Sequence, residues 1–515
     1  MTSKKKRILV WSAAAAAIVG VVIVIVGIMM LRPAYLKRQL VAGLAEHLNL
    51  DVTVGDISLQ FLPRLSVSGT DLVMRLPGRP DLPPFITISH FHVNVGLLSA
   101  MRRHVDTVHV GGLRIEVPPK EAQQTMPPAA TDEKESTKVI VDHLVAHDAE
   151  LVFVPRQKGR PPLTFRIHDL QVDEVGFDRA MPFYAKLTNP VPTGLVETRG
   201  SIGPWSKADP TGLPLSGDYT FTDADLSTIN GIGGRLSSIG KYEGQLTQIS
   251  ASGTTETPDF SLDLGGKPVP LKTKFEAVVN GTNGTTQLVN VDAKMRKTSI
   301  RTRGAITNLA GPGRHDINLH ISISNGRIED ILALAIDAPK PLLVGNLTLE
   351  STFQVPPGKG RVPARIIMAG RFGLDDARFT DQQVQSKLAE LSRRSQGKDK
   401  DDEIGNVLTD LHGRFTVREG LLTLADLTFL VPGAAVELQG TYALETGAID
   451  FSGNLRMQSS MSRAVGGFKS ILLKPFDPLF RKNGAGAVVP IRITGTREAP
   501  KMSVQIGRVF GRGKL

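Results

Sequence analysis

Polar and apolar residues alternate in short runs through most of this sequence, and no other feature constrains its fold as strongly. The alternation is clear in residues 52–61 (VTVGDISLQF), 317–323 (INLHISI) and 427–431 (LTFLV). Gly, Pro, Asn and Asp separate the runs. Because successive side chains of a strand point to opposite faces, each run predicts a strand with one apolar and one polar face. We therefore expect a mainly β protein built from antiparallel strands.

The number of runs restricts the architecture further. About 25–30 runs can be counted, far more than one β-sandwich of about 100 residues holds. Tandem sandwiches would require a linker about every 100 residues, and none follows residue 138. The expected fold is therefore an elongated, curved antiparallel β-sheet that forms a groove, with few short helices. The helices are expected at residues 34–48, 225–239, 325–336 and 382–395.

Residues 8–31 form an uninterrupted apolar run without a charged residue. At about 1.5 Å per residue, a helix of this length spans about 36 Å, enough to cross a hydrocarbon core of about 30 Å. Residues 4–7 (KKKR) precede it, and such basic flanks stay in the cytoplasm. A cleaved signal peptide would have a shorter apolar core and a small-residue cleavage site. We expect a single-pass inner-membrane anchor with a cytoplasmic N-terminus and a periplasmic bulk.

The composition divides the chain into six segments. One of them, PPKEAQQTMPPAATDEKESTK, has almost no apolar residues, which is typical of a disordered loop. The segments are a cytoplasmic tail (1–7), a transmembrane helix (8–31), an N-terminal β region (32–117), the disordered loop (118–138), a central β-groove region (139–412) and a C-terminal β region with a terminal amphipathic segment (413–515).

No pattern of catalytic or metal-binding residues is present. The chain has no cysteine and lacks the phosphate-loop, serine-hydrolase and zinc-protease motifs. His143 and His147, like His90 and His92, have no third ligand at a suitable spacing and are interpreted as surface histidines. The acidic residues in 399–403 lack the glycine and the closing glutamate of a calcium loop. We expect neither an enzyme nor a cofactor.

The positive charge of the chain does not indicate a nucleic-acid partner. The net charge is +11, but apart from the four N-terminal basic residues it is not concentrated, and only 5% of the residues are aromatic. Proteins that bind nucleic acid gather Lys and Arg on one face among aromatic residues on which bases stack. A mildly basic protein is instead compatible with anionic lipid headgroups.

The apolar faces of so many strands need a cover. Helices are scarce, so a sheet that curls lengthwise without closing would leave a long apolar trough, and a large apolar surface marks a binding site. Moving a two-tailed lipid through water exposes about 30 methylenes at about 0.8 kcal/mol each. A trough would remove most of this penalty, so phospholipid is the expected occupant. The predicted groove-lining residues are Val52, Val54, Leu59, Leu113, Ile115, Val117, Phe429, Val431, Val436, Leu438, Tyr442, Leu444, Ile449, Phe451, Leu455 and Met457.

Residues 461–482 combine basic and apolar side chains, a composition suited to a membrane interface. We expect them to contact the outer membrane or an envelope protein, although a helix that plugs the end of the groove would have the same composition. The predicted contact residues are Phe468, Lys469, Ile471, Leu472, Lys474, Phe476, Phe480, Arg481 and Lys482.

Most of the chain resembles the AsmA family. The resemblance lies in residues 52–117, which begin VTVGDISLQFLPRLSVSGTDLVM, in residues 225–288, and in residues 413–504, which include GRFTVREGLLTLADLTFLVPGAAVELQGTYALETGAIDFSGNLRM. It implies an inner-membrane anchor, a chorein-like N-terminal region, a repeating β-groove and phospholipid transfer toward the outer membrane. Residues 118–138 lie outside this resemblance.

Three hypotheses follow for the function. The leading one is a bridge-like carrier that shields phospholipid acyl chains between the two membranes. The second is a non-catalytic envelope scaffold that assists outer-membrane protein assembly and carries no lipid. The third is an adhesin made of tandem sandwiches, which the missing linkers disfavour.

Overall fold

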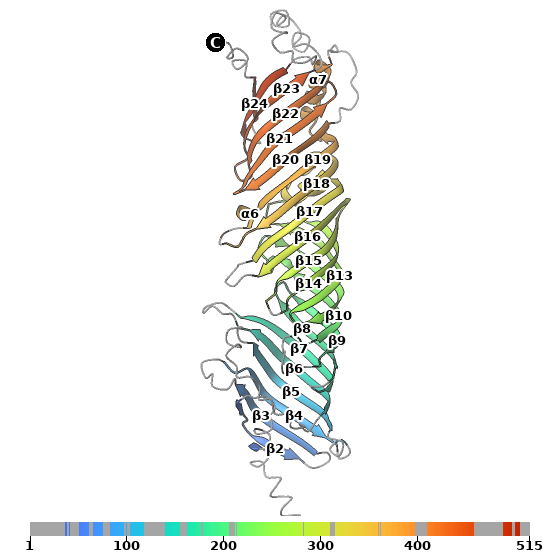
Figure 1. Ribbon diagram of the computed structural model, residues 1–515, viewed down its shortest axis with the longest axis vertical. Helices are drawn as coiled ribbons and strands as arrows, with labels where there is room; N and C mark the ends of the chain where they lie inside the picture. Colours follow the sequence, from blue (N-terminus) through green and yellow to red (C-terminus); the bar gives the residue numbers. More distant parts are fainter. Residues whose placement is uncertain are drawn as a thin grey trace, which may run out of the picture. The chain divides into compact units, whose positions relative to one another are not determined.

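The structure is a computed structural model (Figure 1). Apart from the isolated positions 37, 38, 41, 99 and 212, it describes residues 51–60, 65–75, 83–96, 104–117, 140–154, 162–176, 179–204, 214–281, 283–308, 315–358, 360, 362–396, 409–457, 488–496 and 500–504.

The described residues form 25 strands and few helices, so the predicted mainly β class is confirmed. The chain divides into two compact units, one of Met1–Pro190 and Leu195–Tyr219, the other of Val191–Gly194 and Thr220–Leu515. Unit 1 contains β1 (Asp51–Thr53), β2 (Ile57–Gln60), β3 (Leu65–Arg75), β4 (Ile86–Val95), β5 (His104–Val117), β6 (Ile140–Phe153), β7 (Leu163–Val175) and β8 (Met181–Pro190). The strands β9 (Thr193–Ile202) and β10 (Pro214–Asp225) contribute residues to both units.

Unit 2 holds the remaining strands, and from β12 onward each pairs antiparallel with the next in sequence. They are β11 (Ile232–Gly233), β12 (Arg235–Gln245), β13 (Gln248–Leu262), β14 (Val269–Val279), β15 (Thr286–Met295), β16 (Thr298–Asn308), β17 (His315–Arg327), β18 (Leu343–Val355), β19 (Ile367–Phe379), β20 (Thr409–Arg418), β21 (Leu421–Val431), β22 (Ala434–Ala443), β23 (Ala448–Met457), β24 (Val488–Thr496) and β25 (Pro500–Val504).

One ladder departs from the predicted antiparallel pattern. The strands β5 and β6 run parallel, with His104 opposite Ile140 and Val117 opposite Phe153. A parallel pair requires a crossover of a dozen or more residues, because the chain must return to the edge at which it started. Residues 118–139 make this connection. The length of this connection permits a parallel pairing but does not by itself require one.

Helices are few, as predicted, but not all lie where the sequence indicated. The helix α7 spans Gln382–Ser395 as expected, and α5 occupies Ile328–Ala335 within the predicted residues 325–336. The predicted helix at 225–239 is wrong: only the 3₁₀ turn η2 (Leu226–Thr228) forms there, and β11 and β12 follow. Its glycines carry a large entropic penalty in a helix, whereas residues 237–245 pair with β13. The short helix α6 (Val362–Arg365) was not predicted.

Bulges bend the strands of unit 2 repeatedly. The register shifts in every ladder from β13/β14 to β21/β22 except β16/β17, and each shift adds local bend and twist. Asp223 and Asp376 adopt a positive φ and precede the fully buried Ala224 and Ala377. In unit 1, Asp148 does the same before a buried alanine. This recurring Asp-Ala pair is a sequence signal for a bend.

Three predicted segments lie outside the described residues: the anchor at 8–31, the loop at 118–138 and the basic segment at 461–482. The predicted helix at 34–48 is described only at positions 37, 38 and 41, which are helical. Within the described part of the chain, no helix has both the length and the apolar character needed to cross a bilayer.

Candidate functional site

The apolar face of unit 2 is continuous from β13 to β25. Two rows of cross-strand neighbours follow from the register without interruption. The central row is Gly253, Phe275, Val291, Thr302, Ile321, Ser351, Gly370, Phe415, Leu424, Gly440, Phe451, Ile493 and Met502. The hairpin-side row, nearer the turns of β20–β21 and β22–β23, is Ala251, Ala277, Leu288, Gly304, Leu319, Phe353, Met368, Val417, Leu422, Tyr442, Ile449, Gly495 and Pro500.

Side chains of the two rows are shielded more than those of the opposite face. Among the described side chains, every member of the central row is half-buried or buried, whereas its neighbours along the strands are mostly exposed. All strands of unit 2 belong to one sheet, and no second sheet among the described residues packs on the rows. The asymmetry is expected if the bulged sheet bends toward its apolar face, because side chains crowd on the inside of a bend.

Cross-strand pairs of glycine and phenylalanine recur in the rows. Register pairs Gly253 with Phe275, Gly370 with Phe415 and Gly440 with Phe451. The Phe451 ring lies 2.7 Å from the position that a Cβ of Gly440 would take. A glycine thus lets the neighbouring ring lie against the strand rather than stand away from it. These glycines were not predicted as part of the apolar face because they have no apolar side chain. Each nevertheless lies at a strand position that points to this face.

Two helices cover the other margin of the apolar face. Beside α7 lies a buried set that we call the C-terminal cluster: Val431, Ala434, Val436, Leu455, Met457, Val489 and Ile491. Beside α5, Ile328 and Ile331 pack against the buried residues Ile323, Leu347, Leu374 and Ala377. The apolar face therefore has a packed margin along these helices and a half-buried strip formed by the two rows.

The predicted lining residues of β21–β23 separate into these two regions. Val431, Val436, Leu455 and Met457 belong to the C-terminal cluster, and Phe429 and Leu438 pack against it. Tyr442, Ile449 and Phe451 belong to the half-buried rows. Leu444 lies in the turn between β22 and β23 and is 50% exposed, because the strand ends one residue before it.

In unit 1, the predicted residues also differ in burial. Val52 and Val54 are buried in a cluster with Leu72, Met74 and Phe91. Leu59 in β2 and Leu113 and Ile115 in β5 are half-buried, and Val117 ends β5.

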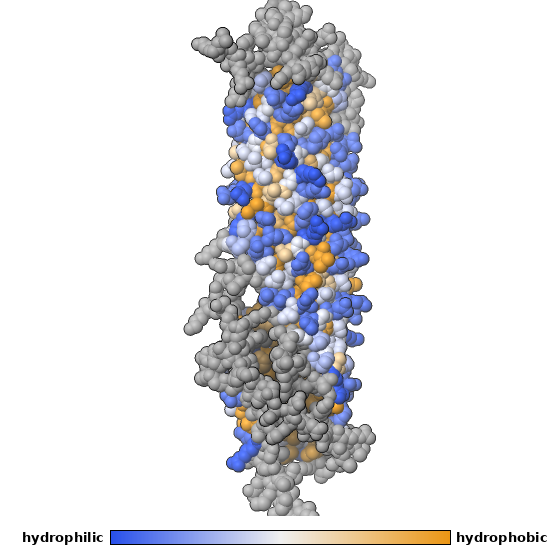
Figure 2. All heavy atoms as spheres, in the orientation of Figure 1, coloured by the Kyte–Doolittle hydropathy of each residue, from blue (hydrophilic) through white to orange (hydrophobic). Residues whose placement is uncertain are grey.

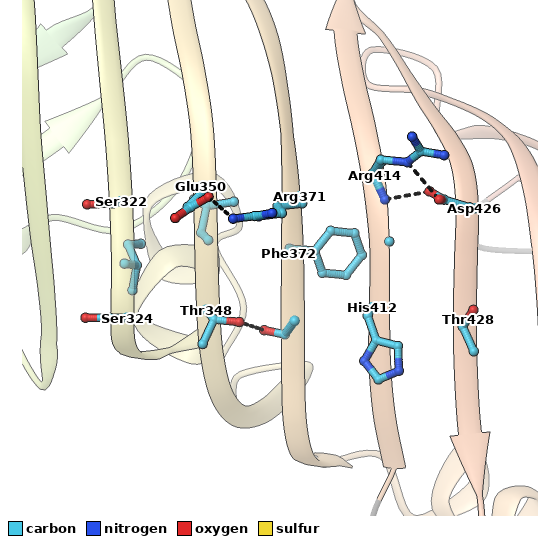
Figure 3. Close-up of a pocket in the computed structure, with 14 residues that line it drawn as sticks. Ser322, Ser324, Thr348, Glu350, Arg371, Phe372, His412, Arg414, Asp426 and Thr428 are labelled. Carbon is cyan, nitrogen blue, oxygen red and sulfur yellow. Dashed lines mark hydrogen bonds and ion pairs between the residues drawn. The ribbon is translucent and has the colours of Figure 1, made fainter.

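The opposite face of unit 2 carries ion pairs between neighbouring strands (Figure 3). Arg371 on β19 pairs with Glu350 on β18, and Arg414 on β20 donates to Asp426 on β21 from Nε at 2.7 Å. Figure 3 shows these pairs around a shallow pocket whose rim includes His412 and Thr428. Hydrophilic residues dominate much of the visible surface in Figure 2, with hydrophobic ones between them. The ion pairs of the opposite face of unit 2 suit contact with water.

The pKa is lowered for three carboxylates of unit 2, the exposed Asp292 and Asp426 and the half-buried Asp225. The backbone N–H of Arg414, together with its side chain, lowers the pKa of Asp426 below its ordinary value of 3.8. Hydrogen bonds from Asn290 and Arg301 lower the pKa of Asp292, and those from the side chain and backbone of Ser227 lower the pKa of Asp225. Each lowered pKa means that the folded state binds fewer protons than the unfolded state as the pH falls toward 3.8.

We expect unit 2 to lose stability in acid through these groups. Their contribution is fully present above the unfolded pKa and disappears as the pH falls through the lower folded pKa. Thermal melts at pH 7, 5, 4 and 3 on the wild type and on Asp426→Asn would measure it. The melting temperature of the variant should lie below that of the wild type at pH 7, and the two should converge near pH 3. A difference that stays constant with pH would contradict the assignment.

The four histidines singled out by sequence lie on strands, and three of them have separate side-chain partners. In β6, Nδ1 of His143 is 2.8 Å from Asp173 Oδ1, and Nδ1 of His147 is 3.0 Å from Asp169 Oδ1. In β4, Nδ1 of His92 is 2.7 Å from the Ser68 hydroxyl. In the part of the chain that the structure describes, no three His, Asp or Glu residues are placed to hold a metal ion.

Comparison with known proteins gives no relative. No family model matches this chain. No curated protein matches it either.

Proposed function

We propose that this chain is a bridge-like lipid carrier of the AsmA type, anchored in the inner membrane by residues 8–31 and extending into the periplasm. The observation that carries the proposal is the half-buried apolar strip of unit 2, in which each row residue has a cross-strand partner in the row on the next strand, across 13 successive strands. A packed globular core would have buried these side chains under a second layer.

Length and composition of the strip both fit acyl chains. Neighbouring strands lie about 4.8 Å apart, so 13 strands provide a track on the order of 60 Å. Its large side chains are aliphatic or aromatic, and the hydroxyls of Thr302 and Ser351 interrupt it only singly. On such a surface, the roughly 30 methylenes of a phospholipid are removed from water. In this mechanism, the acyl chains lie on the strip, and the headgroup stays in solvent.

The experiment is the identification of bound lipid. We expect organic extracts of the full chain, purified from a Gram-negative host, to contain diacyl phospholipid in at least equimolar amount by mass spectrometry. A photoreactive residue at Phe451 should crosslink to this lipid, and one at the exposed Thr416 on the opposite face should not. Without co-purifying lipid or a crosslink at Phe451, the carrier is refuted and the scaffold hypothesis is favoured.

A further inference from the structure

The helix α7 covers the margin of the apolar face at β21–β24. Its side chains Ala389 and Leu391 pack against the C-terminal cluster. This cluster consists only of aliphatic side chains and methionine, and it is continuous with the rows through Leu438 and Phe429, which contact it. Without α7, the half-buried strip would therefore widen onto the C-terminal cluster with no change in chemistry.

Polar contacts attach α7 to the sheet near both of its ends. Near its start, Gln385 Oε1 accepts a hydrogen bond from the backbone N–H of Phe379 in β19 at 3.2 Å. The Ser392 hydroxyl donates to the carbonyl of Pro432 at 2.7 Å, and Gln396 Nε2 donates to the same carbonyl at 3.2 Å. Beside them, a Cβ on Gly433 would lie only 2.5 Å from Gln396 Cγ. The described polar contacts between α7 and β21–β22 thus meet at one two-residue turn.

Part of the surface that α7 buries is polar. Ser392 and Ser395 are fully buried, and the Ser395 hydroxyl has no hydrogen-bond partner among the described atoms. Burial of an unpaired hydroxyl is unfavourable, and the described apolar side chains of α7 that pack against the cluster are those of Ala389 and Leu391. Hydrocarbon would cover the C-terminal cluster without burying a polar group. An acyl chain is therefore an effective competitor of α7 for this surface.

We propose that the C-terminal cluster is a cryptic acyl-chain site, which α7 covers in the present structure and yields to a phospholipid. This inference rests on the proposed function and extends it, because it assigns Val431, Val436, Leu455 and Met457 to lipid contact although they are buried in the present structure.

The full chain permits a reversible test because it has no cysteine of its own. A disulfide requires Cβ atoms about 3.5–4.5 Å apart, and the close approach of Gln396 to Gly433 suits it. The variant Gln396→Cys/Gly433→Cys would carry a diazirine analogue of leucine either at Leu455, in the C-terminal cluster, or at Leu319, in the hairpin-side row. Each of the two labelled proteins would be oxidised with copper–phenanthroline or reduced with dithiothreitol. It would then be irradiated with vesicles of phosphatidylethanolamine and phosphatidylglycerol.

We expect phospholipid adducts at both positions in the reduced protein. Oxidation should lower the amount of the Leu455 adduct at least fivefold and leave that of the Leu319 adduct within twofold. The oxidised and reduced forms carry the same substitutions, so strain at Gly433 affects both forms equally. Equal Leu455 adducts in both redox states, with Leu319 labelled, would overturn the cryptic site and leave the carrier intact. Absence of adducts at Leu319 in every state would instead overturn the carrier itself.

A second variant tests the opposite direction and does not depend on disulfide formation. Ala389→Asp places a charge against the aliphatic cluster and should detach α7. The Leu455 adduct should then rise at least threefold, with Leu319 unchanged. An unchanged Leu455 adduct in this variant would also contradict the proposal.

Discussion

Replacement of Phe415 by aspartate is expected to lower the phospholipid content of the purified full chain at least tenfold. Phe415 lies in the central row on β20, paired with Gly370 and Leu424. A carboxylate in contact with hydrocarbon is unfavourable by about 2.5–3.5 kcal/mol on insertion scales, so a tenfold loss is a conservative expectation. Quantitative mass spectrometry of organic extracts provides the measurement.

The matched control is Thr416→Asp, which places the same charge one residue away on the exposed face of the same strand. It should retain the lipid of the wild type. Phe415→Ala separates loss of apolar contact from loss of fold and should keep most of the lipid. Circular dichroism melts must show that all three variants fold. Equal lipid in the two aspartate variants would show that the rows do not contact lipid.

Replacement of Asp330 by alanine is expected to destabilise unit 2 by about 2–4 kcal/mol, because two donors lose their acceptor at about 1–3 kcal/mol each. Asp330 is 4% exposed. Its Oδ2 accepts hydrogen bonds from the backbone N–H of Lys297 at 3.0 Å and from the Thr298 hydroxyl at 2.9 Å. These bonds join α5 to the turn between β15 and β16.

Urea unfolding, followed by amide hydrogen exchange in β15–β18, would measure the effect. Asp330→Asn keeps one side-chain oxygen as an acceptor, so its destabilisation should stay below about 1 kcal/mol. Gln382→Ala, at an exposed position of α7, should change little. If the alanine and asparagine variants unfold at the same urea concentration, the hydrogen bonds are not what stabilises the junction.

Local patterns predicted much of the fold because they act over a few residues. The period of two placed Val436 and Leu438 on the apolar face of β22. The charged sequence of residues 382–395 predicted α7 with the observed bounds. Asn-Gly pairs are strong hairpin signals, and those at 280–281 and 283–284 lie in the turn between β14 and β15, where the amide of Gly284 donates to the carbonyl of Asn280.

The errors arose where distant partners decide the outcome. Residues 235–245 could have continued a loose helix, but nine residues of this segment pair with β13. The parallel direction of β6 depends on which edge of the sheet the chain reaches after residue 139, which no local pattern encodes. Leu444 follows the alternation of β22, but the turn that joins β23 begins there.

By itself, the sequence determined the mainly β class, the two-faced character of the strands and the scarcity of helices, because alternation and turn residues fix these locally. Only the tertiary structure decided which apolar residues are packed under α5 and α7 and which form the half-buried strip. The reason is physical: alternation assigns a side chain to a face, but its exposure depends on what that face meets, and here the partner is a helix distant in sequence.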